Sequence, residues 1–298
     1  MKVLLTGSAG QLGQALVAKQ PADIELIATT RNELDLSSVE SCRAAVQEYQ
    51  PDWVLNAGAY TAVDKAESEP ELAHAVNAAA PAAFAAAIKE YGGYLLQLST
   101  DFVFNGQQGT PYLPEQQHDP LGVYGASKAD GEKAILSIFG DDMRGLILRT
   151  SWVIGPVGKN FALTMLRLHQ QRNELRVVAD QVGCPSSTLN LADACWHAIL
   201  RRSEGISLPL VMHWSDTGAA SWYDVAVAVG RIGAELGLID NPAYINPITT
   251  AEYYTPATRP SYSLLDCTTS RNALQLKGEH WLQALQTILE KTHSGVTS

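Results

Sequence analysis

Cysteine is scarce in this chain of 298 residues, and its four cysteines, Cys42, Cys184, Cys195 and Cys267, form no C-x-x-C pair. Without such pairs the sequence predicts neither a disulfide framework nor a zinc site. We interpret the four as small buried hydrophobic residues. The seven histidines form no H-E-x-x-H pattern either, so no metal site is expected.

Basic residues are also few. The chain has 21 Lys and Arg residues against 31 Asp and Glu residues, a formal net charge of -10, and no basic run interrupts that balance. Nucleic acids and anionic membranes attract basic surfaces. Neither is therefore expected as a partner.

Long apolar runs are missing as well. No stretch approaches the roughly 20 apolar residues of a membrane-spanning helix. The apolar run in "MKVLLTGSAGQLG" breaks into glycines too early for a signal-peptide core and lacks a small-residue cleavage site. We expect a cytoplasmic protein. Its 46% hydrophobic and 17% charged residues are typical of a folded globular chain.

The first half of the chain alternates short apolar runs with helix-like segments, the pattern of β-α-β units. Strands are expected at residues 2–6, 24–30, 52–59, 93–100 and 145–156, and helices at 11–20, 37–50 and 71–90. The predicted fold class is α/β, a doubly wound parallel sheet (Rossmann-like) with a smaller C-terminal substrate-binding domain. Residues 1–150 are expected to bind a nucleotide and residues 151–298 to form mainly the smaller domain, with some later segments returning to the first.

Three glycines follow the first predicted strand. "TGSAGQLG" places Gly7, Gly10 and Gly13 across the start of a helix, with G-x-x-G-x-x-G spacing. Glycine there allows a tight turn and a close approach of the backbone to a pyrophosphate, which the helix N-terminus attracts. The sequence predicts a dinucleotide site. The alternative is a glycine-rich turn without a ligand.

The end of the second strand selects between nicotinamide cofactors. An acidic residue there bonds the ribose 2'-hydroxyl of NAD, whereas an Arg accommodates the 2'-phosphate of NADP. This chain has Thr30 and Arg31 at that place, so NADPH is predicted, with NADH possible, unless Arg31 is only a solvated surface charge. Asp35 could face the adenine or cap the next helix.

The segment "VYGASK" puts Tyr124 and Lys128 four residues apart, on one face of a predicted helix that follows the polar loop "EQQHDP". An ammonium group nearby lowers the pKa of a phenol, so Lys128 would make Tyr124 a usable acid for hydride transfer to a carbonyl. Thr100 ends the fourth strand and is predicted to hold that carbonyl. Ser99 competes with Thr100 for this role.

These residues stand within longer stretches that resemble a known family. The stretches are "LLTGSAGQLG", "LDL", "NAGAYTAVDKAESEPELAHAVNA", "STDFVFNG", "PLGVYGASKADGEK", "LRTSWVIG", "NFALTMLRL", "DQVGCPSS" and "TPATRPSYSLLD". The chain resembles the extended short-chain dehydrogenase/reductases and, within them, is similar to the dTDP-4-dehydrorhamnose reductases. The resemblance implies NADPH-dependent reduction of the C4 keto group of dTDP-4-dehydro-β-L-rhamnose to dTDP-β-L-rhamnose.

The resemblance also implies roles for individual residues. Tyr124 donates the proton, Lys128 tunes it and bonds the nicotinamide ribose, and Thr100 polarises the carbonyl. The residues expected beside the cofactor are Gly10, Gln11 and Leu12 at the phosphates, Asp35 and Leu36 at the adenine, and Ala59, Tyr60 and Thr61 along the groove. Those expected to contact the sugar nucleotide are Asp101, Trp152 and Arg259.

Each of the three substrate residues has an alternative reading. Trp152 could be a core residue, Arg259 a surface ion pair and Asp101 a loop cap. Arg259 is the best supported of the three, because a diphosphate substrate needs a cationic donor in so acidic a protein.

Two other functions fit the same motifs. One is a related nucleotide-sugar 4-ketoreductase or epimerase that acts on another 6-deoxysugar. The other is a non-catalytic regulatory subunit of a methionine adenosyltransferase, since the fold group includes such proteins. The joint presence of Thr100, Tyr124 and Lys128 favours the reductase. As oligomeric state we expect a monomer or a weak homodimer.

The first predicted helix yields a testable prediction on assembly. The resemblance implies that some relatives dimerise through a divalent metal held by carboxylates on this helix, but here Gln14 and Ala15 offer none. We therefore expect no metal-bridged dimer. Light scattering with magnesium and with a chelator measures this, and a dimer that needs magnesium would contradict it.

Overall fold

Six parallel strands form the central sheet of the computed structural model, which describes residues 1–294. The strands are β1 (Lys2–Thr6), β2 (Glu25–Thr29), β3 (Trp53–Asn56), β4 (Tyr94–Thr100), β5 (Gly145–Thr150) and β10 (Val211–His213). Their order across the sheet is β10-β5-β4-β3-β1-β2, and each neighbouring pair is parallel. In the sheet β2 lies on one side of β1 and β3 lies on the other, so the direction in which successive strands are added reverses at β1. Ligands of such sheets bind where the strand order reverses in this way.

The apolar runs form strands that are buried on both faces of the sheet. Leu4 and Val54 belong to one buried cluster, and their neighbours Leu5 and Leu55 belong to another on the opposite face. Successive side chains of a strand point to opposite faces. Continuous runs such as "VLL" therefore supply both cores, which a sheet covered by helices on both sides requires.

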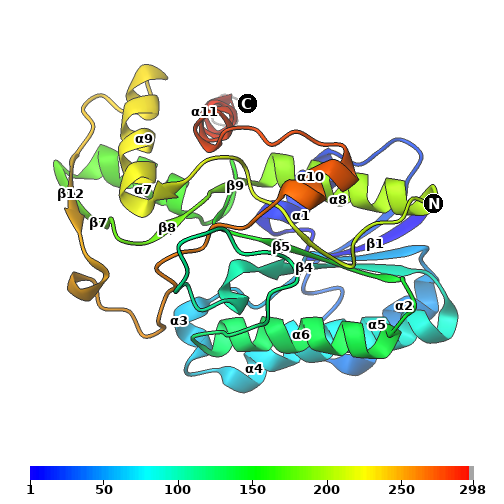
Figure 1. Cartoon of the computed structure of the whole chain (residues 1–298). Coiled ribbons are helices and arrows are strands. Elements are labelled where there is room, and N and C mark those ends of the chain that lie inside the picture. The colour runs from blue at the N-terminus through cyan, green and yellow to red at the C-terminus, as the bar shows by residue number, and fades with distance from the viewer. Residues whose placement is uncertain (295–298) are drawn as a thin grey trace.

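One helical layer lies beneath the sheet in Figure 1. It consists of α2 (Val39–Tyr49), α4 (Pro70–His74), α5 (Ala80–Tyr91) and α6 (Val123–Phe139). Ser38 caps α2 by accepting a hydrogen bond from the backbone N–H of Ser41 at 3.1 Å, as expected for a serine at this position. Gly131 lets α6 lie close to its neighbour, because a Cβ there would be 2.2 Å from the carbonyl oxygen of Asn77.

The helix predicted over residues 71–90 contains a π-helical turn, Ala75–Ala79, between α4 and α5. The turn carries Asn77, which is 2% exposed. Its side chain accepts from the backbone N–H of Tyr60 at 2.9 Å and donates to the carbonyl oxygen of Tyr60 at 3.0 Å. Turns of this kind are frequent at functional sites, and this one fixes the loop that follows β3.

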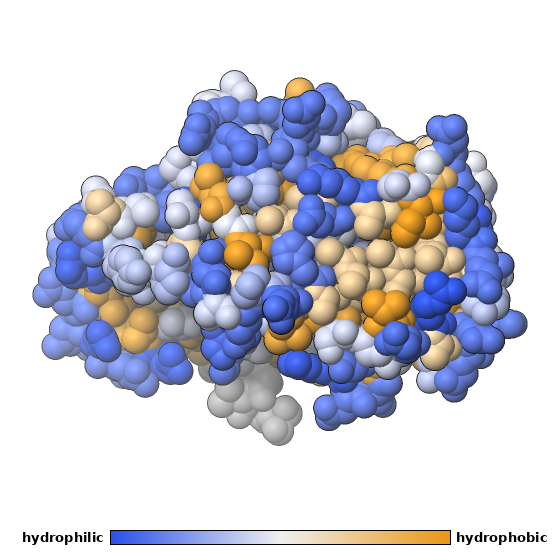
Figure 2. Space-filling view, turned by 90° about the horizontal axis from the view of Figure 1, so that it is seen from below, coloured by the Kyte–Doolittle hydropathy of each residue, from blue (hydrophilic) through white to orange (hydrophobic). Residues whose placement is uncertain are grey.

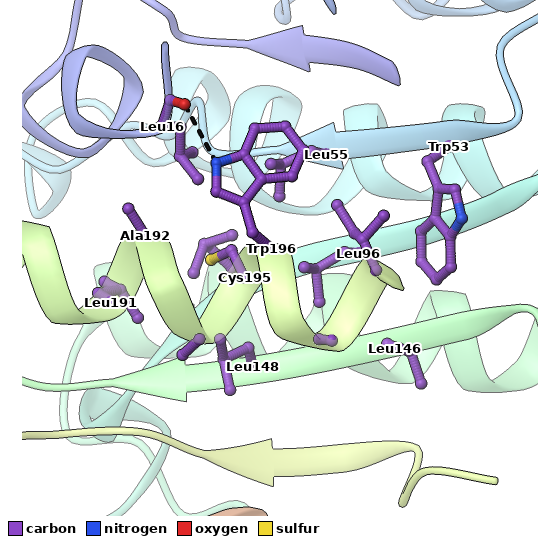
Figure 3. Close-up of a cluster of buried hydrophobic side chains, with 14 of the residues drawn as sticks. Leu16, Trp53, Leu55, Leu96, Leu146, Leu148, Leu191, Ala192, Cys195 and Trp196 are labelled. Atoms are coloured by element: carbon purple, nitrogen blue, oxygen red, sulfur yellow. Dashed lines mark hydrogen bonds between the residues drawn. The ribbon is translucent and has the colours of Figure 1, made fainter. Parts of the chain in front are cut away.

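The opposite face of the sheet is covered by α1 (Gln11–Ala18), α8 (Thr188–Ser203) and α10 (Thr268–Leu274). Figure 3 shows the core beneath α8, where Trp196 donates from Nε1 to the carbonyl oxygen of Leu16 at 3.1 Å. The indole therefore buries its rings without leaving its N–H unpaired. Through this contact α8, far along the chain, is joined to the first helix.

The second half contributes a further layer with its own core. Its main elements are α7 (Phe161–Gln171), β7 (Glu174–Val178), α9 (Trp222–Glu235), β12 (Tyr244–Ile248) and α11 (Trp281–Ser294). A separate buried cluster, which includes Met165, Val229 and Ile288, holds them together. The domain division at residue 150 stays a prediction; α8 and β10 are later segments that lie with the first half.

The predicted fold class is confirmed, whereas two strand predictions were too long. The third strand ends at Asn56 and not at residue 59, because residues 57–59 turn into the loop that Asn77 holds. The fifth ends at Thr150. Trp152 has a φ of 47°, which a strand does not allow. Beyond it β6 (Val153–Ile154) leaves the sheet to pair with β9 (Ser186–Ser187).

The surface seen from below, over the layer of α4, α5 and α6, carries an apolar area bordered by polar side chains (Figure 2). Apolar atoms make up much of any folded surface, so this alone assigns no partner. Within residues 1–294 no helix combines the length and apolar character needed to cross a membrane. The cytoplasmic location stays a prediction.

Candidate active site

Two adjoining cavities open at the carboxyl ends of the central strands. The sheet-edge cavity, of about 630 Å³, is lined by the loops after β1, β3, β4 and β5 and by the start of α6. The outer cavity, of about 880 Å³, is lined mainly by α7, β7 and the segment of residues 253–263. They share Phe102, Trp152, Phe161, Trp222 and Arg259. The two cavities therefore form one cleft between the sheet and the second half of the chain.

The glycine loop forms one wall of the sheet-edge cavity. Gly7 has a φ of 69°, and a Cβ on it would lie 2.7 Å from the Cα of Gly58. A Cβ on Gly13 would lie 2.1 Å from the carbonyl oxygen of Gly7. A Cβ on Gly7 would overlap the loop after β3, and a Cβ on Gly13 would overlap the glycine loop itself. Glycine at both positions therefore allows the backbone beside the cavity to pack closely.

Most residues predicted at the cofactor line this cavity. They are Gly7, Gly10, Gln11, Leu12, Gly13, Arg31, Ala59, Thr61, Tyr124 and Lys128. Gln11 also joins the two halves, because its Oε1 accepts from Nδ2 of Asn160 at 2.8 Å.

Four predicted cofactor residues, Thr30, Asp35, Leu36 and Tyr60, lie outside the lining. Thr30 donates from Oγ1 to Glu33 at 2.8 Å. Asp35 accepts from the backbone N–H and the hydroxyl of Ser37 at 2.9 and 2.8 Å, so its carboxylate closes the turn before α2.

Leu36 and Tyr60 support the cavity wall from behind. A Cβ on Gly58 would lie 2.5 Å from Cδ1 of Leu36. Tyr60 donates its hydroxyl to Glu69 at 2.6 Å, away from the cleft. The adenine role predicted for Leu36 and the groove role predicted for Tyr60 stay predictions.

The cavity brings together the three predicted catalytic side chains. Tyr124 and Lys128 lie on α6, and Thr100 ends β4. Lys128 donates from Nζ to the carbonyl oxygen of Leu98 at 2.6 Å. The ring edge of Tyr124 packs on Phe102, with centroids 5.5 Å apart. A hydroxyl, a phenol and an ammonium group therefore face one space.

The predicted net lowering of the pKa of Tyr124 is wrong, because burial raises it. Removal from water raises the pKa of Tyr124 to about 12, and a hydrogen bond with Thr100 offsets this only partly. Removal from water also lowers the pKa of Lys128 to about 8, against the opposing charge of Glu132. Desolvation therefore outweighs the Thr100 hydrogen bond at Tyr124 and the charge of Glu132 at Lys128. At neutral pH Tyr124 therefore keeps the proton that an acid must donate.

The residues predicted at the substrate lie where the two cavities meet. Trp152 stacks on Trp222 with ring centroids 3.6 Å apart and an angle of 8° between the planes. Asp101 is 2% exposed and accepts from Oγ1 of Thr100 at 2.9 Å. Burial raises the pKa of Asp101 to about 6. Both side chains are thus held in place by partners within the cleft.

Arg259 forms an ion pair within the cleft. It donates from Nη1 and Nη2 to the two carboxylate oxygens of Asp64 at 3.0 and 2.7 Å. This bidentate contact lowers the pKa of Asp64 and joins α3 (Val63–Ala66) to the distant segment of residues 253–263. The ion-pair alternative for Arg259 is thus observed, although Arg259 lines both cavities.

Sequence reasoning missed several lining residues, among them Asp64, Lys159, Phe161 and Trp222. The Ser221-x-x-Asp224 capping box marks the start of α9 and could have located Trp222 on a helix. Nothing local in the sequence indicates that this helix end meets Trp152. That contact depends on the packing of segments about seventy residues apart.

Fold and site together define a member of the extended short-chain dehydrogenase/reductases. A glycine loop follows the first strand of a Rossmann-like sheet, and Tyr124 and Lys128 face Thr100 across its edge. More narrowly, the chain belongs to the family described as RmlD substrate binding domain, whose model matches residues 1–294.

Relatives with known names agree with this membership. A dTDP-4-dehydrorhamnose reductase of Aggregatibacter actinomycetemcomitans is 36% identical over 291 residues, which cover 96% of this chain and 98% of the relative. The structure of such a reductase from Clostridium acetobutylicum has a TM-score of 0.87 at 33% identity, covering 97% of this chain and 99% of that one. Another, from Bacillus anthracis in complex with NADP, has a TM-score of 0.87 at 31% identity and covers 98% and 99%. The predicted resemblance is confirmed.

Across residues 1–294 no three or more His, Cys, Asp or Glu side chains gather in a way that could hold a metal ion.

The lowered pKa of Lys128 predicts a pH dependence of stability. The folded protein loses the Lys128 proton near pH 8, and the unfolded chain loses it near its ordinary value of 10.5. Between these values the unfolded state binds more protons, so this group makes the free energy of unfolding rise with pH. Lys128→Met removes the titrating group and is expected to remove this part of the rise.

Urea unfolding of the parent and the variant between about pH 8 and about pH 10 measures the difference. Lys133→Met, on the exposed face of the same helix, is the matched control and should follow the parent. If parent and Lys128→Met gave parallel curves, the lowered pKa would be disproved.

Proposed function

We propose that this protein reduces the C4 keto group of dTDP-4-dehydro-β-L-rhamnose with NADPH to give dTDP-β-L-rhamnose. The observation that carries the proposal is that Thr100, Tyr124 and Lys128 line the same cavity as the glycine loop. Membership of the RmlD substrate binding domain family and the names of the relatives support it. A fold alone does not give the substrate class, which is taken from the other sequence motifs that resemble the family.

The sheet-edge cavity fits a dinucleotide. The glycine loop lines it, and the N-terminus of α1 would offer backbone N–H groups to the charge of the pyrophosphate. The NADP bound to the relative from Bacillus anthracis supports this assignment. NADPH, when bound, supplies the hydride. Arg31 is the residue proposed to meet the 2'-phosphate, because it lines the cavity and the residue before it, just after β2, is Thr30 and not an acid.

Thr100 and Tyr124 are proposed to act on the carbonyl oxygen. As negative charge grows on that oxygen, the Thr100 hydroxyl, which donates to Asp101 in the structure, would turn to donate a hydrogen bond to it and stabilise the charge. Tyr124 then donates its phenolic proton to the same oxygen. The high pKa of Tyr124 ensures that this proton is present. The positive charge of Lys128 stabilises the phenolate that remains.

The outer cavity is proposed to hold the rest of the sugar nucleotide. Arg259 and Trp152 lie at its junction with the sheet-edge cavity. A guanidinium there would meet the diphosphate, and the stacked indoles of Trp152 and Trp222 would offer a flat apolar surface to a ring. Asp101, close to Thr100, would meet the sugar.

Replacing Tyr124 tests the proposed acid. Tyr124→Phe keeps the ring against Phe102 and removes only the hydroxyl, so kcat is expected to fall about 100-fold or more. NADPH absorbance, followed with dTDP-4-dehydro-β-L-rhamnose, measures this. Tyr91→Phe, at the exposed end of α5 and outside both cavities, is the matched control and should keep parental turnover.

Three results would speak against the assignment. Equal rates for Tyr124→Phe and the parent would remove the proposed acid. Faster turnover of another keto-sugar nucleotide would favour a related 4-ketoreductase or epimerase. A stoichiometric enzyme partner in a pull-down, together with no hydride transfer to any keto-sugar, would favour the regulatory subunit.

Replacing Arg31 tests the proposed cofactor preference. Arg31→Ala removes the cation at the 2'-phosphate, so the Kd for NADPH is expected to rise about tenfold or more, while the Kd for NADH, which lacks this phosphate, stays unchanged. Nicotinamide fluorescence titration measures both. Arg231→Ala, on the exposed face of α9, serves as the control. A similar loss for both cofactors would contradict the role of Arg31.

A further inference from the structure

A buried ionic cluster lies directly behind the catalytic side chains. Its members are Ser99 on β4, His118 in the loop before α6, Glu132 on α6, Arg149 on β5 and His213 on β10. The four titratable members line neither cavity, and only Ser99 borders the sheet-edge cavity. Any effect of the titratable members on the reaction must therefore pass through other residues.

The centre of the cluster is an ion pair. Arg149 donates from Nε to both carboxylate oxygens of Glu132 at 3.0 Å and from Nη2 to Oε2 at 2.6 Å. Glu132 is 1% and Arg149 2% exposed. Burial raises the pKa of Glu132, but hydrogen bonds from His118 and Arg149 outweigh it and bring the pKa to about 2. Removal from water and the charge of Arg149 lower the pKa of His213 to about 3, so His213 is neutral.

Glu132 joins the helix of the acid to the strand of the carbonyl anchor. Tyr124, Lys128 and Glu132 follow one another at intervals of four residues, so they lie along one face of α6. The hydroxyl of Ser99 donates to Oε1 of Glu132. Ser99 directly precedes Thr100 and is paired in register with Arg149 on β5. One carboxylate thus links α6, β4 and β5 beside the reacting groups.

The cluster also holds the segment that leads into α6. Arg149 donates from Nη1 to the carbonyl oxygen of Pro114 at 3.0 Å. Nδ1 of His213 lies 3.1 Å from the carbonyl oxygen of Tyr112. Nε2 of His118, in the "EQQHDP" loop, lies 2.9 Å from Oε2 of Glu132. The segment before α6 is therefore tied to the cluster at Tyr112, Pro114 and His118.

The contact between α6 and the end of β4 leaves little room for movement. A Cβ on Gly125 would lie 2.1 Å from the carbonyl oxygen of Phe102. Lys128 is bonded to the carbonyl oxygen of Leu98 at 2.6 Å. Because these contacts lie on either side of Thr100, a shift of α6 changes the separation of Tyr124 and Thr100 directly.

From this geometry we infer that Glu132 and Arg149 are positioning residues for the reduction: their ion pair sets the place of α6 against β4 and so the alignment of Tyr124 with Thr100. The inference rests on the proposed function. Misplacement of a catalytic group by about 1 Å can cost about 100-fold in rate. The pair acts through the helix and touches neither ligand.

Two variants test the inference. Glu132→Gln keeps the size of the side chain and removes its charge, and Arg149→Lys keeps the charge and loses the bidentate geometry. For both, kcat is expected to fall about tenfold or more, while KM and the Kd for NADPH stay close to those of the parent. Leu285→Ala, a core deletion in the separate cluster of the second half, controls for loss of stability and should keep the parental kcat at 25 °C. If Glu132→Gln does not fold, Arg149→Lys carries the test.

Hydrogen exchange gives a readout that needs no turnover. In Arg149→Lys the amides of residues 123–139 should exchange faster than in the parent, while those of residues 222–235 stay unchanged. Parental kcat in both variants would overturn the inference. A parent that oxidises no NADPH with the substrate would overturn the proposed function instead. In that case hydrogen exchange alone tests the positioning role, and unchanged exchange over residues 123–139 in Arg149→Lys would overturn the inference.

Discussion

The reversal of strand order at β1 is the constraint on which the rest of the structure depends. Because the chain leaves β1 for β2 on one side and reaches β3 on the other, the loops that follow β1 and β3 diverge from a common edge. Near that edge the two loops still touch each other. A Cβ on Gly7 or on Gly58 would overlap neighbouring atoms, so both positions need glycine. The same edge receives the ends of β4 and β5. The glycine loop and the Thr100 hydroxyl therefore lie at the same edge of the sheet.

A chain of buried amides keeps the strand ends in register below this edge. Thr6 on β1 donates to Asn56 on β3 at 2.5 Å, and Asn56 donates to Gln97 on β4 at 2.7 Å. Gln97 in turn donates to the carbonyl oxygen of Leu98 at 2.7 Å, which also accepts from Lys128. A partly satisfied polar network would destabilise the sheet, whereas a paired one specifies its geometry. The polar network and the Glu132 ion pair thus both hold β4, the network through Gln97 and the ion pair through Ser99.

Local chemistry explains which parts could be predicted from the sequence. Buried strands, the glycine loop and the spacing of Tyr124 and Lys128 are each encoded within a few neighbouring residues, so the parallel sheet and most residues predicted at the cofactor followed from them. The strand order and the sixth strand, β10, were not predicted. Asp35 was ambiguous because a carboxylate before Ser37 closes a turn as readily as it contacts an adenine. The residue pairs that were missed, Trp152 with Trp222 and Asp64 with Arg259, join segments far apart in the chain. No local pattern predicts such contacts.

The pKa of Tyr124 could not be predicted for a related reason. The spacing to Lys128 gives only the direction in which its charge shifts the pKa of Tyr124. The burial of the phenol and of the ammonium group depends on how α6 packs on β4. Burial is the largest contribution to both pKa shifts.

This high pKa suits the chemistry proposed for the site. A weak acid gives up its proton only to a strongly basic oxygen, and a carbonyl oxygen becomes strongly basic once hydride has reached the adjacent carbon. Proton transfer from Tyr124 is therefore favourable only late in the reaction. In the proposed reaction, desolvation of the phenol would couple proton delivery to hydride arrival, and Lys128, which is mostly protonated below its pKa of about 8, would add a positive charge near the phenolate as it forms.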